Sequence, residues 1–326
     1  MRRVSVPGKV LLAGEYAVLL PGRPCLVAAV ERRLSVESIL AGRWSVDTGR
    51  VRWLEGEPVP EEAQFVAAAI EAVRAQYGVS PQALTTIDEL HVGDRKLGLG
   101  GSAAVTVGTV FVTAPVGTQR DALWRLAHRV HRAAQGGRGS GADVAASTFG
   151  GVQRFHSEPH PSEVARRRTV AVHPAVHLDL VWTGASARTA PRLLTWSDFV
   201  RVSPKKAELF GELSTAAVDT LQRGLETADL EALRAGVGGA RAALKGLEAE
   251  LGLELETDVI RAASDAAWKA GACGKLSGAG GGDCAVVLTI GDEQRADITR
   301  ALTALGLDIV PVEWARSGAE EHPTET

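Results

Sequence analysis

Residues 96–105, with the sequence KLGLGGSAAV, place Gly98, Gly100 and Gly101 directly before Ser102. Glycine allows a loop to turn tightly and lets its backbone N–H groups approach a ligand closely. The run AAVTVGTVFV after Ser102 carries no charge, which predicts a buried helix that begins at the serine. A glycine loop leading into a helix N-terminus favours anions, because unpaired N–H groups and the helix dipole both attract negative charge. The stretch therefore predicts a phosphate-binding loop.

This loop matches neither G-x-G-x-x-G nor G-x-x-x-x-G-K-[ST], and by itself it is equally consistent with a structural turn. Three further glycine-bearing stretches favour the phosphate interpretation. They are residues 7–16 (PGKVLLAGEY), 138–151 (RGSGADVAASTFGG) and 275–284 (KLSGAGGGDC). Four such segments spread over 326 residues predict loops that converge on one phosphate-binding cleft.

The composition excludes several classes of protein. A chain of 326 residues is long enough for two domains, and 45% hydrophobic with 23% charged residues is typical of a soluble globular protein. A net charge of −3 gives no basis for nucleic-acid binding, and three cysteines without close pairing argue against a disulfide framework. Neither a signal peptide nor a membrane-spanning run is evident. We therefore expect a cytoplasmic protein, a monomer or a homodimer, without a nucleic-acid or membrane partner.

Helices and strands are expected in both halves of the chain, which predicts an α/β or α+β fold. Helical patterns occur over residues 60–77, 102–115, 120–135, 205–251 (two helices, with a break near 224–229), 257–270 and 293–304. Strand patterns occur over residues 4–6, 10–13, 26–30, 34–39, 44–53, 84–91, 152–155, 170–182, 285–290 and 308–312. The first two strands flank a predicted turn at Pro7-Gly8, and residues 317–326 are expected to fray.

Three of the glycine stretches, PGKVLLAGEY, GLGGSAA and SGAGGGDC, resemble the three motifs of the GHMP kinases in order and spacing. The resemblance extends over roughly residues 4–312. It implies an α+β fold of two domains, with the active site between them. Residues 1–160 would resemble ribosomal protein S5 domain 2, and residues 161–326 would be ferredoxin-like. Within the family, residues 139–151, residues 181–194 and Asp283 are most similar to the phosphomevalonate kinase branch.

The resemblance also implies an activity: ATP- and Mg²⁺-dependent phosphorylation of (R)-5-phosphomevalonate in the mevalonate route to isoprenoids. Phosphoryl transfer needs bound phosphates, a divalent metal, a nearby cation and an oriented nucleophile. Two alternatives stay open. One is a kinase for mevalonate or another small alcohol, and the other is a decarboxylase of the same pathway.

Asp143 is the carboxylate between Asp121 and Glu158, at the start of an apolar helix. It suits either a helix-terminal acid held by backbone N–H groups or a group that orients the acceptor. The resemblance matches it to the family's catalytic aspartate. Lys9 suits a solvated turn, but the resemblance places it beside this aspartate, where it can offset developing charge.

The resemblance assigns further residues to the nucleotide and the acceptor. The nucleotide phosphates would lie on Gly98, Leu99, Gly100, Gly101, Ser102 and Ala103, and Ser102 would also be a ligand of Mg²⁺. The substrate would contact Tyr16, Ser140, Gly141, Ser277, Gly278, Ala279 and Gly280. Lys275 is a candidate phosphate cation, Asp283 is expected to support its loop, and Arg188 with Thr189 can meet an acidic substrate.

Two positions depart from the family pattern. Gly101 replaces the first serine of the usual GLGSSAA, which leaves Ser102 as the hydroxyl of the loop. The family's mevalonate kinases also carry a metal-binding glutamate before the aspartate, whereas residues 128–137 (HRVHRAAQGG) contain no acid. The metal would then be held by Ser102 and the nucleotide phosphates, or by a ligand elsewhere in the chain.

Overall fold

An eight-stranded sheet is built on two long strands, β1 (Arg2–Ala13) and β2 (Pro24–Leu40). The computed structural model describes residues 1–92, 95–157, 165–187 and 189–322. The strand order is β14-β1-β2-β5-β3-β4, and β8 joins β2 and carries β9 beside it. The remaining bounds are β3 (Ser45–Asp47), β4 (Arg52–Leu54), β5 (Gln82–Asp88), β8 (Val152–His156), β9 (Arg166–Val170) and β14 (Glu320–His322).

The turn predicted at Pro7-Gly8 is wrong, because β1 continues through it. The pairing of β1 with β2 changes register between Pro7 and Gly8, as it does at a β-bulge. Proline, which has no backbone N–H, is tolerated at such a position. The two short strands predicted over residues 26–39 are likewise one strand, β2. Lys9 therefore lies on a strand, and its N–H donates to the carbonyl of Leu99 (2.8 Å).

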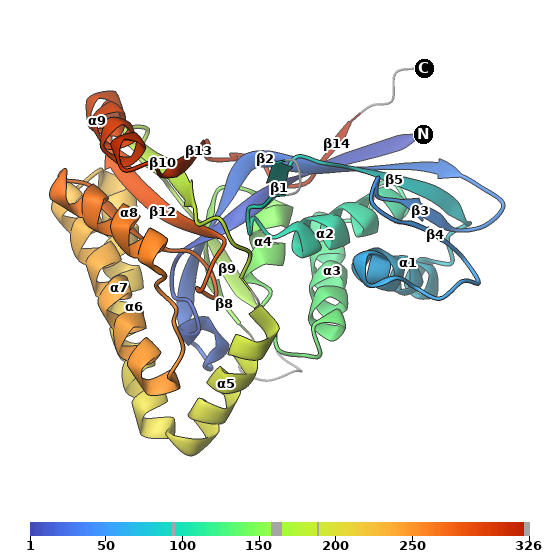
Figure 1. The fold of residues 1–326 in the computed structure, drawn as a ribbon. Coiled ribbons are helices and arrows are strands. Elements are labelled where there is room, and N and C mark those ends of the chain that lie inside the picture. Colours follow the sequence, from blue (N-terminus) through green and yellow to red (C-terminus); the bar gives the residue numbers. More distant parts are fainter. Residues whose placement is uncertain (93–94, 158–164, 188, 323–326) are drawn as a thin grey trace.

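Four helices cover one face of this sheet (Figure 1): α1 (Gln64–Tyr77), α2 (Gly101–Thr113), α3 (Arg120–Ala134) and α4 (Ala142–Phe149). The uncharged helix α2 is buried as predicted and packs on β1 and β2. Gly108 makes this approach possible, since a Cβ there would lie 2.6 Å from a methyl group of Val36. Short 3-10 turns, η1 (Ala17–Leu19) and η2 (Glu61–Ala63), precede β2 and α1.

The second sheet is antiparallel, with the order β11-β12-β10-β13. Its strands are β10 (Val176–Trp182), β11 (Cys273–Leu276), β12 (Cys284–Ile290) and β13 (Asp308–Pro311). The helices α7 (Leu230–Leu251), α8 (Asp258–Lys269) and α9 (Gly291–Ala304) pack against it, and α6 (Pro204–Thr227) forms a long hairpin with α7 (Figure 1). Among the described residues, no helix is long and apolar enough to cross a membrane.

Several elements are not evident from the local sequence pattern. Helix α5 (Thr189–Val202) has a weak apolar pattern, since Trp196 is its buried residue. The hairpin β6 (His91–Val92) and β7 (Arg95–Lys96) precedes the first glycine loop. Strand β14 lies in the segment expected to fray and pairs with β1, whereas residues 323–326 are outside the described part. Both β9 and β14 add to the first sheet from beyond residue 160, and the division at that residue stays a prediction.

Candidate active site

A cavity of about 690 Å³ lies where the four glycine-bearing segments meet. This volume is typical of small-molecule sites. Strand β1, the first glycine loop with α2, the loop before α4, helix α5 and the loop between β11 and β12 all contribute to its lining. Its polar side chains include Lys9, Ser102, Ser140, Asp143, Thr189 and Ser277. The convergence predicted from four separate stretches is therefore present.

The first glycine loop turns directly into α2 at the cavity. Gly98 and Gly100 have φ values of 75° and 77°, in the left-handed region that favours glycine, and Gly100 is the residue before the helix. A Cβ on Gly100 would lie 2.8 Å from Cγ of Lys9. Gly101 and Ser102 then begin the helix and line the cavity. This places the N-terminus of an apolar helix, with its positive dipole end, at the cavity wall.

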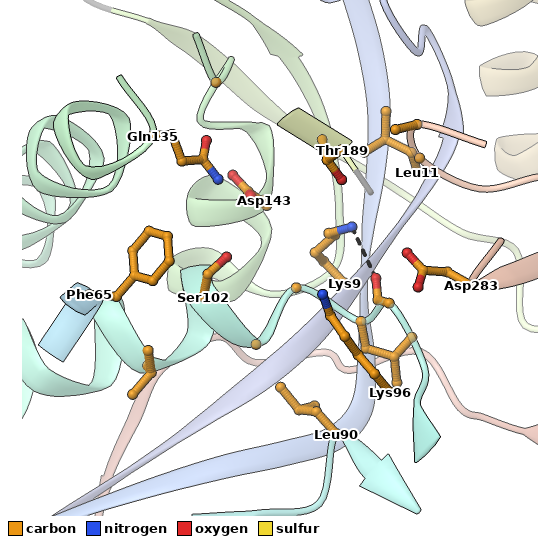
Figure 2. Close-up of a pocket in the computed structure, with 18 of the residues that line it drawn as sticks. Lys9, Leu11, Phe65, Leu90, Lys96, Ser102, Gln135, Asp143, Thr189 and Asp283 are labelled. Atoms are coloured by element: carbon orange, nitrogen blue, oxygen red, sulfur yellow. Dashed lines mark hydrogen bonds between the residues drawn. The ribbon is translucent and has the colours of Figure 1, made fainter. Parts of the chain in front are cut away.

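Two lysines stand in the middle of the cavity, with a carboxylate on either side. Lys9 Nζ donates to the carbonyl of Gly98 (3.3 Å). Figure 2 shows Lys9 and Lys96 between Asp143 on one side and Asp283 on the other. The arrangement provides cations for phosphate groups together with a carboxylate that can orient an acceptor.

Asp143 combines the two interpretations that its sequence position leaves open. It lies in the first turn of α4, and its Oδ1 accepts a hydrogen bond from the N–H of Val144 (2.9 Å), as a helix-terminal acid does. Its other oxygen, Oδ2, lies 3.8 Å from Nε2 of His131. The side chain is 21% exposed and lines the cavity. One oxygen thus fixes the carboxylate, and the group remains open to a ligand.

Hydroxyl groups join the segments around Tyr16, Ser140 and Ser277 at the cavity wall. The Tyr16 phenol donates to the carbonyl of Ala279 (2.6 Å), and Oγ of Ser277 accepts from the N–H of Leu11 (3.0 Å). Burial raises the pKa of the Tyr16 phenol above its usual range, so this donor stays protonated. Oγ of Ser140 accepts from the N–H of Ala142 (3.3 Å), which braces the loop before α4.

Most of the residues predicted for ligand binding line this cavity. Those that do are Lys9, Tyr16, Gly98, Leu99, Gly100, Gly101, Ser102, Ser140, Asp143, Ser277, Gly278 and Ala279. Ala103 is instead buried in α2, Gly141 packs against the ring of His128, and Gly280 packs against Leu255. Thr189 lines the cavity, whereas Arg188 lies outside the described residues. The binding roles remain predictions.

Lys275 is not a phosphate cation, and that interpretation is corrected. Its side chain is fully buried, with Nζ 2.5 Å from Oε1 of Glu15 and 2.5 Å from the carbonyl of Leu276. The sequence could not distinguish a buried lysine from an exposed one, because Lys275 stands directly before a glycine loop. The ion pair joins the end of the first motif to the start of the third.

Several residues in or beside the lining were not predicted from the sequence, among them Phe65, Lys96, His131 and Gln135. Lys96 stands directly before the first glycine loop, and the glycines after it carry the stronger local signal. His131 lies four residues after Ala127 on the buried face of α3. A polar ring on an apolar helix face was the available signal. Phe65 offered none, because it resembles any other core aromatic residue.

The oxygen donors in the cavity fit a magnesium ion. Ser102 supplies a hydroxyl and Asp143 a carboxylate, and both line the same wall. Across the described ranges, no three His, Cys, Asp or Glu side chains group to hold a metal by themselves. Mg²⁺ is typically bound by one or two protein oxygens, with substrate phosphates and water completing its shell. Ser102 and Asp143 are the residues that would hold it.

The chain is similar to known proteins along nearly its whole length. The family model for the GHMP kinases N terminal domain matches residues 64–151. The phosphomevalonate kinase of Streptomyces sp. (strain CL190) is 33% identical, over 90% of this chain and 91% of that protein. The mevalonate kinase of Aeropyrum pernix is 32% identical, over 88% of each. A structure of Streptococcus pneumoniae phosphomevalonate kinase with phosphomevalonate and AMPPNP has a TM-score of 0.83 at 20% identity, covering 96% of this chain and 100% of that one.

The chain therefore belongs to the GHMP kinase family and is an ATP-dependent kinase of small molecules. The match to solved structures over the whole chain confirms the predicted α+β GHMP kinase fold. The two relatives differ in their substrates but are almost equally identical to this chain. Identity alone therefore does not choose between them.

Proposed function

We propose that this protein is a phosphomevalonate kinase. It would transfer the γ-phosphoryl group of ATP to (R)-5-phosphomevalonate, giving the 5-diphosphate and ADP in the mevalonate route to isoprenoids, in the cytoplasm. The observation that carries the proposal is one cavity that joins a helix N-terminus, two lysines and Asp143. The choice of 5-phosphomevalonate over mevalonate rests on residues 139–151, residues 181–194 and Asp283, which resemble the phosphomevalonate kinase branch.

The nucleotide would occupy the side of the cavity near α1 and α2. Figure 2 shows Phe65 beside Ser102 and Leu90 below it. With Leu34 and Val105 they form an apolar wall suited to a purine. The triphosphate would then reach the glycine loop, where backbone N–H groups, Ser102 and the helix dipole meet it. Lys96 would meet the phosphates from the side of the β6–β7 hairpin.

The acceptor would occupy the opposite side, near α5 and the third glycine loop. Thr189 and Leu11 lie there in Figure 2, and Ser277 and Ser140 add hydroxyl groups. Such donors suit a phosphorylated, carboxylate-bearing acceptor, because each anion needs several hydrogen bonds or a cation when it leaves water. Lys9 stands between the two sides and can contact the acceptor phosphate.

The chemistry then requires positioning more than proton removal. An acceptor that is itself a phosphate monoester is mostly ionised at neutral pH, so Asp143 need not act as a strong base. Asp143 would orient the acceptor oxygen in line with the γ-phosphorus, and Lys9 would offset the charge that develops. Mg²⁺, when bound, would neutralise charge on the ATP phosphates.

ADP release with Mg-ATP and each of mevalonate, 5-phosphomevalonate, homoserine and galactose tests the proposal, with CO₂ followed in parallel. Turnover with 5-phosphomevalonate alone, without CO₂, is the expected result. Turnover with mevalonate in its place would overturn the substrate assignment and leave the family intact. A parallel assay supplies 5-diphosphomevalonate with Mg-ATP, and release of CO₂ there would favour the decarboxylase alternative.

A further inference from the structure

His131 contacts both residues on which the proposed chemistry depends. It lies in the last turn of α3, and its Nε2 is 3.1 Å from Oγ of Ser102 and 3.8 Å from Oδ2 of Asp143. The Gln135 amide nitrogen lies 3.3 Å from the same ring nitrogen. Ser102 begins α2 and Asp143 begins α4, so one imidazole from a third helix spans the two.

A core role alone does not account for this ring. The His131 side chain is 1% exposed and packs against Phe65, with ring centroids 5.3 Å apart. Its other nitrogen, Nδ1, has no hydrogen-bond partner among the described residues. A buried polar atom without a partner costs free energy, and an apolar side chain of similar size would avoid that cost. What the imidazole adds is its Nε2 edge, which faces Ser102 and Asp143.

We propose that His131 is a positioning residue for the phosphoryl transfer. Its Nε2 makes the hydrogen bond that holds the Ser102 hydroxyl on the nucleotide side, and the contact of the ring with Oδ2 of Asp143 limits how far that carboxylate can turn on the acceptor side. The inference rests on the proposed function and deepens it, since the ring sets the relative position of the groups that meet the two substrates. The ring itself is buried and acts through Ser102 and Asp143.

Three substitutions separate positioning from packing. Gln can place an amide where Nε2 lies, Asn reaches only as far as Nδ1, and Leu fills the space without a polar atom. We expect His131→Leu and His131→Asn to lower kcat about 10- to 100-fold, with the acceptor KM within about 3-fold, and His131→Gln to keep most of the activity. Val130→Ala, a buried neighbour on α3, is the control. It should lower the unfolding temperature and leave kcat unchanged.

If His131→Leu does not fold, the comparison of His131→Gln with His131→Asn still distinguishes positioning from packing. Equal losses in the Gln and Asn variants, at equal unfolding temperatures, would overturn the positioning role. So would a loss of kcat in Val130→Ala as large as that in His131→Leu.

A double-mutant cycle on nucleotide binding tests the contact with Ser102 without needing the acceptor. The dissociation constant of Mg-AMPPNP is measured for wild type, Ser102→Ala, His131→Leu and the double variant. We expect each single change to weaken binding about 3- to 10-fold, and the double variant to match Ser102→Ala within about 2-fold. Independent, multiplying effects would overturn the proposal. Because no turnover is measured, an incorrect acceptor assignment does not affect this result.

Discussion

The first and third glycine loops look alike in sequence but are built differently. The first loop (residues 98–101) ends in the N-terminus of α2, and two of its glycines take left-handed conformations at the cavity wall. The third loop (residues 277–283) joins two strands, and protein groups already occupy much of its backbone. The N–H of Gly281 donates to Leu255 (2.7 Å) and that of Asp283 to Ala185 (2.8 Å).

The glycines of the two loops have different structural roles. In the first loop, glycine lets the backbone come close to Lys9 and opens a helix end to a ligand. In the third loop, glycine lets backbone pack on backbone, since a Cβ on Gly280 would lie 2.7 Å from the carbonyl of Leu255. Changes near the first loop should therefore cost activity, and changes in or before the third loop should cost stability.

The largest effect on activity is expected from Asp143→Asn, in the first turn of α4. Asn can still accept a hydrogen bond from Val144, so the fold should hold. It cannot supply the negative charge, and kcat should fall about 10²- to 10³-fold. Steady-state kinetics with Mg-ATP and the identified acceptor measure this loss. Near-normal turnover in the variant would remove Asp143 from the mechanism.

Lys275→Met should act on stability instead. It leaves Glu15 charged and buried without its cation, and breaking such a pair costs about 3–5 kcal/mol in the free energy of unfolding. Denaturant unfolding measures the loss, and adding Glu15→Gln should recover part of it. A large rise in the ATP KM with unchanged stability would instead restore Lys275 as a phosphate-binding residue.

Gly100→Ala and Gly280→Ala compare the two loops by the same substitution. Both glycines have φ above 70°, so each alanine carries about 1–2 kcal/mol of backbone strain. In Gly280→Ala the new methyl group also meets backbone, which should lower stability further. In Gly100→Ala the new methyl group meets the flexible Lys9 side chain, which should be displaced. Expressed as free energy, the loss in kcat should therefore exceed the loss in the free energy of unfolding. The contrast between the loops would be contradicted if the two variants lost the same amount of kcat and the same free energy of unfolding.

Tyr16→Phe should have the smallest effect. It removes the hydrogen bond to Ala279, worth about 0.5–1.5 kcal/mol, and loosens the third loop beside the acceptor. The acceptor KM should rise a few-fold while kcat stays close to wild type. Tyr77→Phe is the natural control, because Tyr77 is the second of two tyrosines and lies at the end of α1. Both variants are compared by kinetics and thermal unfolding.

The sequence predicts the elements with strong local signals and misses those set by distant contacts. The helix after Ser102 is evident from its uncharged run, and the end of α1 from Gly78, which is left-handed in the structure. The continuity of β1 through Pro7 depends on pairing with β2, which no local pattern reveals. The meeting of α2, α3 and α4 at His131 is likewise a property of packing.

Nucleotide binding to two serine variants tests the contrast between the loops most directly. Mg-AMPPNP is titrated into wild type, Ser102→Ala and Ser277→Ala. If the nucleotide phosphates lie on the first loop, Ser102→Ala weakens binding about 3- to 10-fold, the value of one hydrogen bond to a ligand, and Ser277→Ala binds like wild type. Loss of affinity in Ser277→Ala with normal binding in Ser102→Ala would place the phosphates on the third loop and contradict the account.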